Sequence, residues 1–216
     1  MKTVLMAHSK GGVGKSTLAG ILLEAWEGTG LVGAVETDRQ ESFQRRIDRL
    51  KEERGFAQPD QPILQITDTR GELGARAHAA DLIVIPVGPT EDELQVTVSF
   101  LESFGAEDRK RVALVPIRFH LAGRSLIRQH KEALDYIHAM VDQFELAAVL
   151  PWITYRPLVQ EFSQVFPTNP FHAVPEAHQS NPSFERMLEE FREFANGVAF
   201  LLQLPELELS EAEAVA

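Results

Sequence analysis

The sequence predicts an α/β protein with a single doubly wound, mostly parallel sheet flanked by helices. Short apolar runs alternate along the chain with longer segments of helical period, which is the pattern of β–α–β units. The first apolar run leads directly into a loop rich in glycine and lysine, and then into an amphipathic segment. With 216 residues, of which 44% are hydrophobic, the chain can bury a core of this kind. We expect one domain over residues 1–204 and an acidic tail over residues 205–216.

Two kinds of pattern define the elements of the first half of the chain. In the expected helices the apolar residues recur every three or four positions, so that they line one face. The expected strands are short apolar runs, as is usual for parallel strands that are buried on both faces. In chain order, these elements are a strand at Thr3–Ala7, a helix at Lys15–Trp26, a strand at Leu31–Glu36, a helix at Glu41–Arg54 and strands at Ile63–Thr67 and Leu82–Pro86.

Capping and proline signals organise the second half. Thr90 and Glu93 have the spacing of a capping box, which predicts a helix that runs to about Phe104. Four prolines between residues 166 and 182 predict an irregular connection or lid, and Ser183 begins the last amphipathic helix. The remaining elements are strands at Val112–Ile117 and Ala147–Leu150, with a long helix between them from about Arg124 to Phe144.

The composition excludes several classes of protein. There are no cysteines, which rules out disulfides, a thiolate zinc site, an iron–sulfur cluster and a cysteine nucleophile. No apolar run reaches the length of about 18 residues that a membrane-spanning helix needs, and the apolar stretch at the start is too short for a signal peptide. A formal net charge of −11 argues against a globally basic nucleic-acid-binding protein. We therefore expect a cytoplasmic protein with no membrane partner.

The loop after the first strand carries the strongest chemical signal. Its residues are Lys10-Gly11-Gly12-Val13-Gly14-Lys15-Ser16-Thr17. Glycines allow tight turns that present backbone N–H groups, and the N-terminus of the following helix adds positive potential. Lys15 can reach the β- and γ-phosphates of a nucleotide, and the Ser16 hydroxyl can ligate Mg²⁺. Ser9 stands where the ordinary phosphate-loop pattern has a glycine, so the loop is a K-G-G-x-G-K-[ST] variant with an additional lysine, Lys10.

Four segments resemble the ParA/MinD family of dimeric ATPases. The loop Lys10–Thr17 looks like the family's deviant Walker A motif, which belongs to the P-loop NTPase fold. Glu36–Gln40 resembles its D-x-D-P-Q segment, with Asp38 at the second aspartate, and Asp68–Gly71 resembles its Walker B D-x-P-G. Ala80–Val87 looks like the family's A-D-L-V-I-I-P-V strand. The resemblance spans residues 1 to about 160, and the size is that of the short ParA-like partition ATPases without an N-terminal helix-turn-helix domain.

The sequence departs from the family pattern at three positions. Glu36 replaces the first aspartate of the D-x-D-P-Q segment, Arg39 replaces its proline, and Arg70 replaces the proline of Walker B. The first two bear on the loop that positions the attacking water, whereas Walker B keeps Asp68 and Gly71. A scaffold that binds nucleotide without hydrolysing it is the alternative that these departures favour.

The resemblance implies an ATPase with Mg²⁺ as cofactor and a weak intrinsic activity that a partner protein stimulates. Lys15 and the loop amides would hold the phosphates, Ser16 and Asp68 would hold Mg²⁺, and Asp38 would orient the attacking water. In the family the signature lysine, here Lys10, crosses to the phosphates of the other subunit, so that an ATP-dependent homodimer encloses two ATP molecules. The alternative is that Asp38 starts a helix and Asp68 ends a strand without a catalytic role.

A basic run is the second informative feature. Seven basic residues and no carboxylate lie between Arg109 and Lys131. On the expected long helix, Arg124, Arg128 and Lys131 have i, i+4, i+7 spacing, which places them on one face. That face could contact DNA phosphates without reading bases, as ParA-like proteins do on nucleoid DNA, or it could be a solvated outer face. Of the histidines, His8 beside the loop and His130 are interpreted as structural.

The sequence is compatible with three functions. The leading hypothesis is a ParA-like ATPase that drives plasmid or DNA partition, or the positioning of another cargo. An accessory ATPase of conjugative DNA transfer would share the same nucleotide switch. A small-molecule ligase of the dethiobiotin synthetase type, which belongs to a different class, would share the fold, although Lys10 favours the switch.

Overall fold

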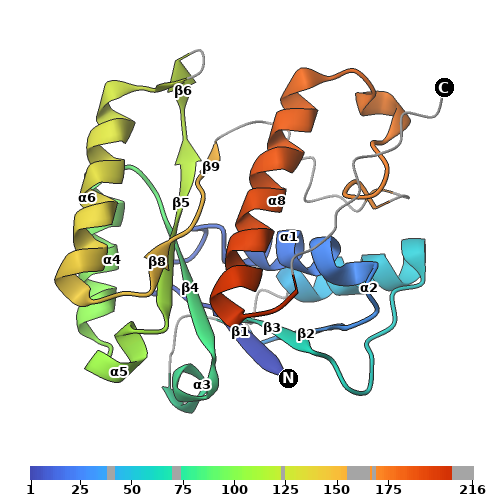
Figure 1. Ribbon diagram of the computed structural model, residues 1–216, viewed down its shortest axis with the longest axis horizontal. Coiled ribbons are helices and arrows are strands. Elements are labelled where there is room, and N and C mark those ends of the chain that lie inside the picture. The colour runs from blue at the N-terminus through green and yellow to red at the C-terminus, as the bar shows by residue number, and fades with distance from the viewer. Residues whose placement is uncertain (38–41, 70–73, 123–124, 155–165, 167–168, 206–216) are drawn as a thin grey trace.

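In the computed structural model, seven strands form one sheet. Helices cover both faces of this sheet (Figure 1). The structure describes residues 1–37, 42–69, 74–122, 125–154, 166 and 169–205. The strand order is β2-β3-β1-β4-β5-β8, β9 pairs with β5, and every pairing in this sheet is parallel. The expected doubly wound α/β fold is thereby confirmed.

The sequence predicts six of the seven strands, and β9 is additional. Within the sheet, β1 lies between β3 and β4, with Met6 level with Asp68 and Val84. The chain crosses from one side of β1 to the other, which makes the carboxyl end of β1 a topological switch point, where sheets of this kind bind ligands. The strands are β1 (Lys2–Met6), β2 (Val32–Glu36), β3 (Leu64–Asp68), β4 (Leu82–Val87), β5 (Val112–Phe119), β8 (Ala148–Val149) and β9 (Ile153–Thr154).

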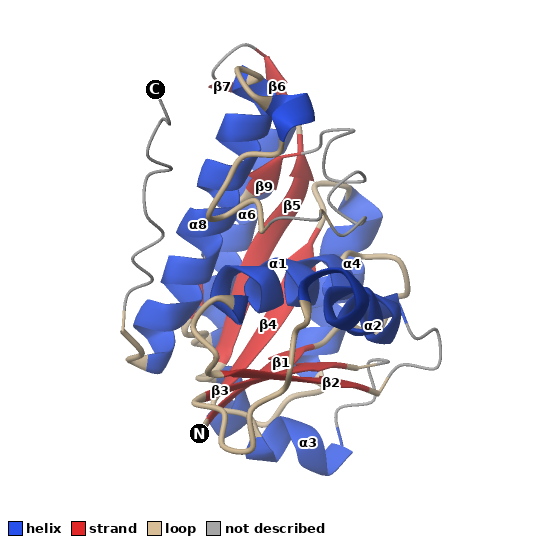
Figure 2. Cartoon of the chain, turned by 90° about the vertical axis from the view of Figure 1, so that its right-hand side faces the viewer, coloured by secondary structure: helices blue, strands red, loops and turns tan. Residues whose placement is uncertain are grey.

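Alternating side chains of the strands face two separate helical layers. Val4 and Met6 of β1 pack in the core beneath α1, α2 and α8, whereas Leu5 and the following Ala7 pack against α4 and α6 on the other face (Figures 1 and 2). The helices are α1 (Lys15–Glu27), α2 (Ser42–Arg54), α3 (Gly74–Ala79), α4 (Glu91–Glu102), α5 (Ala106–Arg109), α6 (Arg128–Phe144) and α8 (Pro182–Leu202), with a 3₁₀ turn η1 at Glu176–His178. Among the described residues, no helix is long and apolar enough to cross a membrane.

The long helix α6 begins at Arg128, so the predicted start near Arg124 is wrong. Before it, β6 (Leu121–Ala122) and β7 (Ser125–Leu126) pair as a two-stranded antiparallel ribbon. The N–H of Ile127 then donates to the carbonyl oxygen of His120 at 3.2 Å. Leu126 has the spacing that would extend the apolar stripe of Leu134, Ile137 and Val141 on this helix, but it is used in strand pairing instead. Arg124 follows β6 in sequence and lies outside the described residues.

The last helix starts one residue earlier than predicted because Asn181 caps it. The Oδ1 atom of Asn181 accepts hydrogen bonds from the N–H groups of Ser183 and Phe184, and Pro182 occupies the first turn. The proline-rich connection before it is irregular in its described part apart from η1. The predicted acidic tail lies, from residue 206 on, outside the described residues.

Candidate functional site

The phosphate loop lies at the switch point, between the end of β1 and the start of α1. Gly12 and Gly14 have φ angles of 72° and 98°, in the left-handed region that favours glycine. Gly14 is the N-cap residue of α1, and within the described residues no side chain caps this helix or places a carboxylate in its first turn. The first N–H groups of α1 are therefore directed toward a space where an anion can bind.

Three of the predicted site residues lie together at the end of this loop, two from the loop itself and Asp68 from β3. The side chain of Lys15 is only 5% exposed, and its Nζ atom lies 3.5 Å from the carbonyl oxygen of Lys10. The hydroxyl of Ser16 donates to Oδ2 of Asp68 at 2.5 Å. Asp68 is fully buried at the end of β3. A hydroxyl and a buried carboxylate are hard oxygen donors, so this pair fits Mg²⁺.

The buried side chain of His8 holds the phosphate loop through a hydrogen bond to its backbone. Its Nδ1 atom accepts a hydrogen bond from the N–H of Lys10 at 2.9 Å, and its Nε2 atom lies 3.3 Å from the hydroxyl of Thr97. That hydroxyl donates to the carbonyl oxygen of Glu93, so it accepts from His8, which carries its proton on Nε2. Burial, reinforced by the positive charge of Lys15, lowers the pKa of His8 to about 4. The imidazole is therefore neutral at pH 7.

The segment after β2 approaches Asp68 from the other side. The N–H and hydroxyl of Thr37 both donate to the carbonyl oxygen of Asp68, at 3.0 and 2.9 Å. Glu36 accepts a hydrogen bond from the N–H of Phe43 at 3.0 Å, so this departure from the family pattern caps the first turn of α2. The predicted catalytic Asp38 lies outside the described residues, as do Arg39 and Arg70.

The basic run does not form one surface. Its first members lie near the start of β5 and its last near the start of α6, at opposite ends of the sheet (Figure 1). Arg111 pairs with Asp108, and Arg118 pairs with Glu93. Both carboxylates lie outside the basic run in the sequence, so the spacing of the basic residues does not predict these ion pairs.

Two of the three predicted DNA contacts are placed by the structure. Arg128 and Lys131 are exposed on the first turn of α6, three residues apart and hence on one side of the helix. Arg128 is 92% exposed and pairs with Glu132 at 2.9 Å. Arg124, the third, lies outside the described residues.

A cavity of about 250 Å³ adjoins the phosphate loop, and the sequence did not lead us to predict it. Three arginines of α2 contribute to its lining. In the sequence, these arginines belong to a polar stripe of α2 with i, i+3, i+4, i+7 spacing, which lies next to the apolar stripe of the same helix. The lining residues are Ser16, Thr17, Ser42, Arg45, Arg46 and Arg49.

Comparisons with known proteins identify the fold. No protein-family model matches the sequence, and no curated protein matches it either. Among solved structures, apo McdA from Cyanothece superposes with a TM-score of 0.62 at 17% identity, over 89% of this chain and 98% of that one. A Borrelia burgdorferi protein assigned to plasmid partition and bound to AMPPNP gives 0.56 at 17% identity, over 89% and 97%. The pNOB8 ParA protein bound to nonspecific DNA gives 0.60 at 14% identity, over 94% and 98%. MinD from Aquifex aeolicus also matches, and the chain has the fold that these ParA/MinD-type proteins share.

Proposed function

We propose that this protein is a ParA-like ATPase that binds ATP with Mg²⁺, forms a nucleotide-sandwich dimer and hydrolyses ATP to drive DNA partition or cargo positioning. The observation that carries the proposal is a phosphate loop with two lysines, placed at the switch point beside the Ser16–Asp68 pair. The shared fold supports it, because neighbours with that fold are described with AMPPNP and with DNA. Such a protein acts in the cytoplasm.

Phosphoryl transfer depends mainly on positioning and charge neutralisation, and each residue of the proposed site has one of these roles. Lys15 and the N–H groups of the loop bind the phosphates. Ser16 and Asp68 would hold Mg²⁺, which would supply positive charge to the phosphate oxygens. Asp38, two residues after Glu36, orients the attacking water.

Lys10 is the residue suited to act on a second subunit. It is exposed, and its loop position is held through its backbone N–H by His8 rather than through its side chain. Among the described residues, Lys10 has no ion pair. A cation that reaches the phosphates only in the dimer makes hydrolysis depend on dimerisation, as an arginine finger supplied in trans does.

The test is whether dimerisation follows the nucleotide. We expect wild-type protein to be monomeric without nucleotide and dimeric with a non-hydrolysable ATP analogue, as measured by light scattering. Lys10→Ala should bind ATP but remain monomeric, whereas Asp38→Ala should form the dimer and lose hydrolysis. A dimer of equal strength in the apo, ADP and ATP states would contradict a switch, and hydrolysis without dimerisation would favour a small-molecule ligase.

One observation favours a second candidate, the accessory ATPase of conjugative transfer. The basic run is dispersed over two ends of the sheet, and much of it is paired with carboxylates. A cargo surface that recognises protein needs no continuous basic face. In both candidates we expect a partner protein that stimulates hydrolysis.

A further inference from the structure

The cavity beside the phosphate loop is lined by three arginines that the proposed nucleotide chemistry does not use. It is lined by the first turn of α1 and by one face of α2, and none of the described residues that line it is acidic. With about 250 Å³, it is below the range of about 300–1,000 Å³ that is typical of small-molecule sites. Its volume suits a small anion rather than a second nucleotide.

The helix α2 has two neighbouring stripes that explain how this lining arises. One stripe is apolar and fully buried, and consists of Phe43, Ile47 and Leu50. The other is polar, with i, i+3, i+4, i+7 spacing, and consists of Ser42, Arg45, Arg46 and Arg49. Because the apolar stripe docks the helix on the core, the polar stripe is directed at the phosphate loop.

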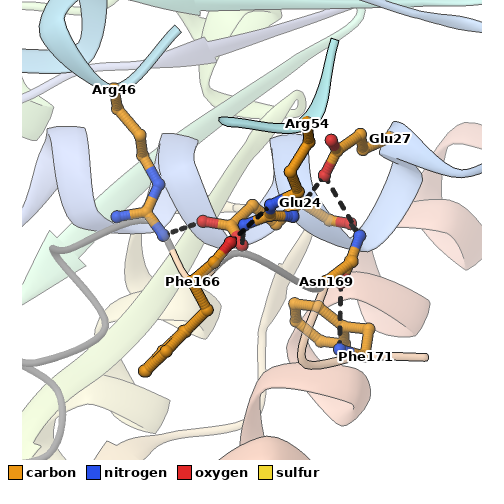
Figure 3. Close-up of polar contacts among 7 residues, drawn as sticks. All are labelled: Glu24, Glu27, Arg46, Arg54, Phe166, Asn169 and Phe171. Atoms are coloured by element: carbon orange, nitrogen blue, oxygen red, sulfur yellow. Dashed lines mark hydrogen bonds and ion pairs between the residues drawn. The ribbon is translucent and has the colours of Figure 1, made fainter. Parts of the chain in front are cut away.

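Buried carboxylates hold part of this stripe in place (Figure 3). Arg46 is 7% exposed and donates to Glu24 of α1, which also accepts from Arg54 at 2.5 Å. Arg54 pairs in turn with Glu27 at 2.5 Å and donates to the carbonyl oxygen of Phe166 at 2.9 Å. The two carboxylates balance the two guanidinium groups, so the network fixes Arg46 before any ligand binds.

The charge of Arg49 is not balanced in this way. It lies one turn further along the stripe and is exposed at the cavity. Within the described residues it has no ion pair, although the protein as a whole has a net charge of −11. Guanidinium groups together with hydroxyls are the side chains that bind phosphate oxygens most effectively.

We propose that this cavity is a second phosphate site, which adjoins the phosphate loop at Ser16 and Thr17 and takes its positive charge from α2. Its ligand is a phosphate group, either free inorganic phosphate or a phosphate monoester carried by a nucleotide. Arg46 and Arg49 bind the phosphate oxygens, and the hydroxyls of Thr17 and Ser42 line the same space. The site goes beyond the proposed function, because it requires neither dimerisation nor hydrolysis.

The decisive experiment is a ³¹P NMR titration with inorganic phosphate in a Lys15→Ala background, which disables the phosphate loop. We expect that background to bind phosphate still, and Arg49→Ala within it to weaken binding at least about tenfold. Lys51→Ala is the matched control, because Lys51 lies on the same helix, is not among the described residues that line the cavity, and forms an exposed ion pair with Asp48 at 3.6 Å. It should leave the affinity within about twofold. Circular dichroism checks that each variant is folded.

Loss of all phosphate binding in the Lys15→Ala background, or equal weakening by Arg49→Ala and Lys51→Ala, would overturn the second site. A second titration compares a nucleoside 5′-monophosphate with a 3′,5′-bisphosphate. If the bisphosphate binds more tightly than the monophosphate and Arg49→Ala removes that difference, the ligand is a phosphate carried by a nucleotide. If Arg49→Ala weakens the binding of inorganic phosphate alone, the ligand is the free ion. Failure of wild-type protein to bind ATP would reject the proposed function and leave this result standing.

Discussion

Lys15 and His8 hold the phosphate loop in shape before any ligand arrives. The ammonium group of Lys15 lies against the carbonyl oxygen of Lys10, and the imidazole of His8 accepts the N–H of the same residue. Both side chains are buried, so the loop conformation depends on two contacts that solvent barely reaches.

The first prediction concerns the charge of Lys15. Lys15→Ala should lower the affinity for ATP–Mg²⁺ at least about 100-fold, because it removes the buried lysine of the loop that we propose binds the phosphates. Isothermal titration calorimetry measures the affinity, and Lys2→Ala, which removes an exposed lysine paired with Asp81, is the control. Wild-type affinity in Lys15→Ala would rule out nucleotide binding by this loop.

The second prediction concerns pH. The pKa of His8 is about 4 in the folded protein and about 6.5 in the unfolded chain, so the unfolded state binds more protons between these values. The stabilisation by neutral His8 is therefore complete above pH 6.5 and is lost as the pH falls toward 4. At pH 5 the loss should be about 2 kcal/mol. Urea unfolding at pH 7 and pH 5 should show this loss in wild type but not in His8→Gln, whose amide does not titrate.

Among the elements, α1 and α2 are joined by more than their apolar stripes. The ion network of Glu24, Glu27, Arg46 and Arg54 connects them, and through Phe166 it reaches the proline-rich connection (Figure 3). Burial raises the pKa of Glu27, an effect that the charge of Arg54 opposes. Since α1 begins at the phosphate loop, this network fixes the position of α2 relative to that loop.

The third prediction concerns the stability of this connection. Glu24→Ala should lower the free energy of unfolding by about 3–5 kcal/mol, because it removes the fully buried carboxylate that Arg46 and Arg54 share. Glu132→Ala removes the partner of the exposed Arg128 and should cost less than about 0.5 kcal/mol. Urea denaturation compares the two variants. Similar losses in both would mean that the buried network does not stabilise the helix pair.

At the scale of the whole molecule, the net charge limits how the surface can bind DNA. A net charge of −11 repels DNA at long range, so binding requires a local basic patch, which the proposed dimer would present twice. The described candidates for such a patch are Arg128 and Lys131 on α6.

The fourth prediction follows from that balance. DNA binding should require ATP, be independent of sequence and weaken steeply with salt, because each neutralised phosphate releases counterions. Arg128→Glu should weaken binding equally on unrelated DNA sequences without changing the affinity for ATP. Gel-shift titrations at low salt with ATP provide the measurement. If wild-type protein gives no shift there, its cargo surface recognises protein, and the conjugation-accessory candidate replaces partition.

The features that the sequence alone determines are those carried by neighbouring residues. The phosphate loop, the order of strands and helices, and the Thr90 cap of α4 depend on short spacings, because backbone conformation and helix capping are local. The tertiary structure alone decided the start of α6, where strand pairing competed with a helical pattern. It also decided the pairing of Arg118 with Glu93 and the arginine-lined cavity. These features join groups that are far apart in the chain, and only the packing of helices on the sheet determines which of them meet.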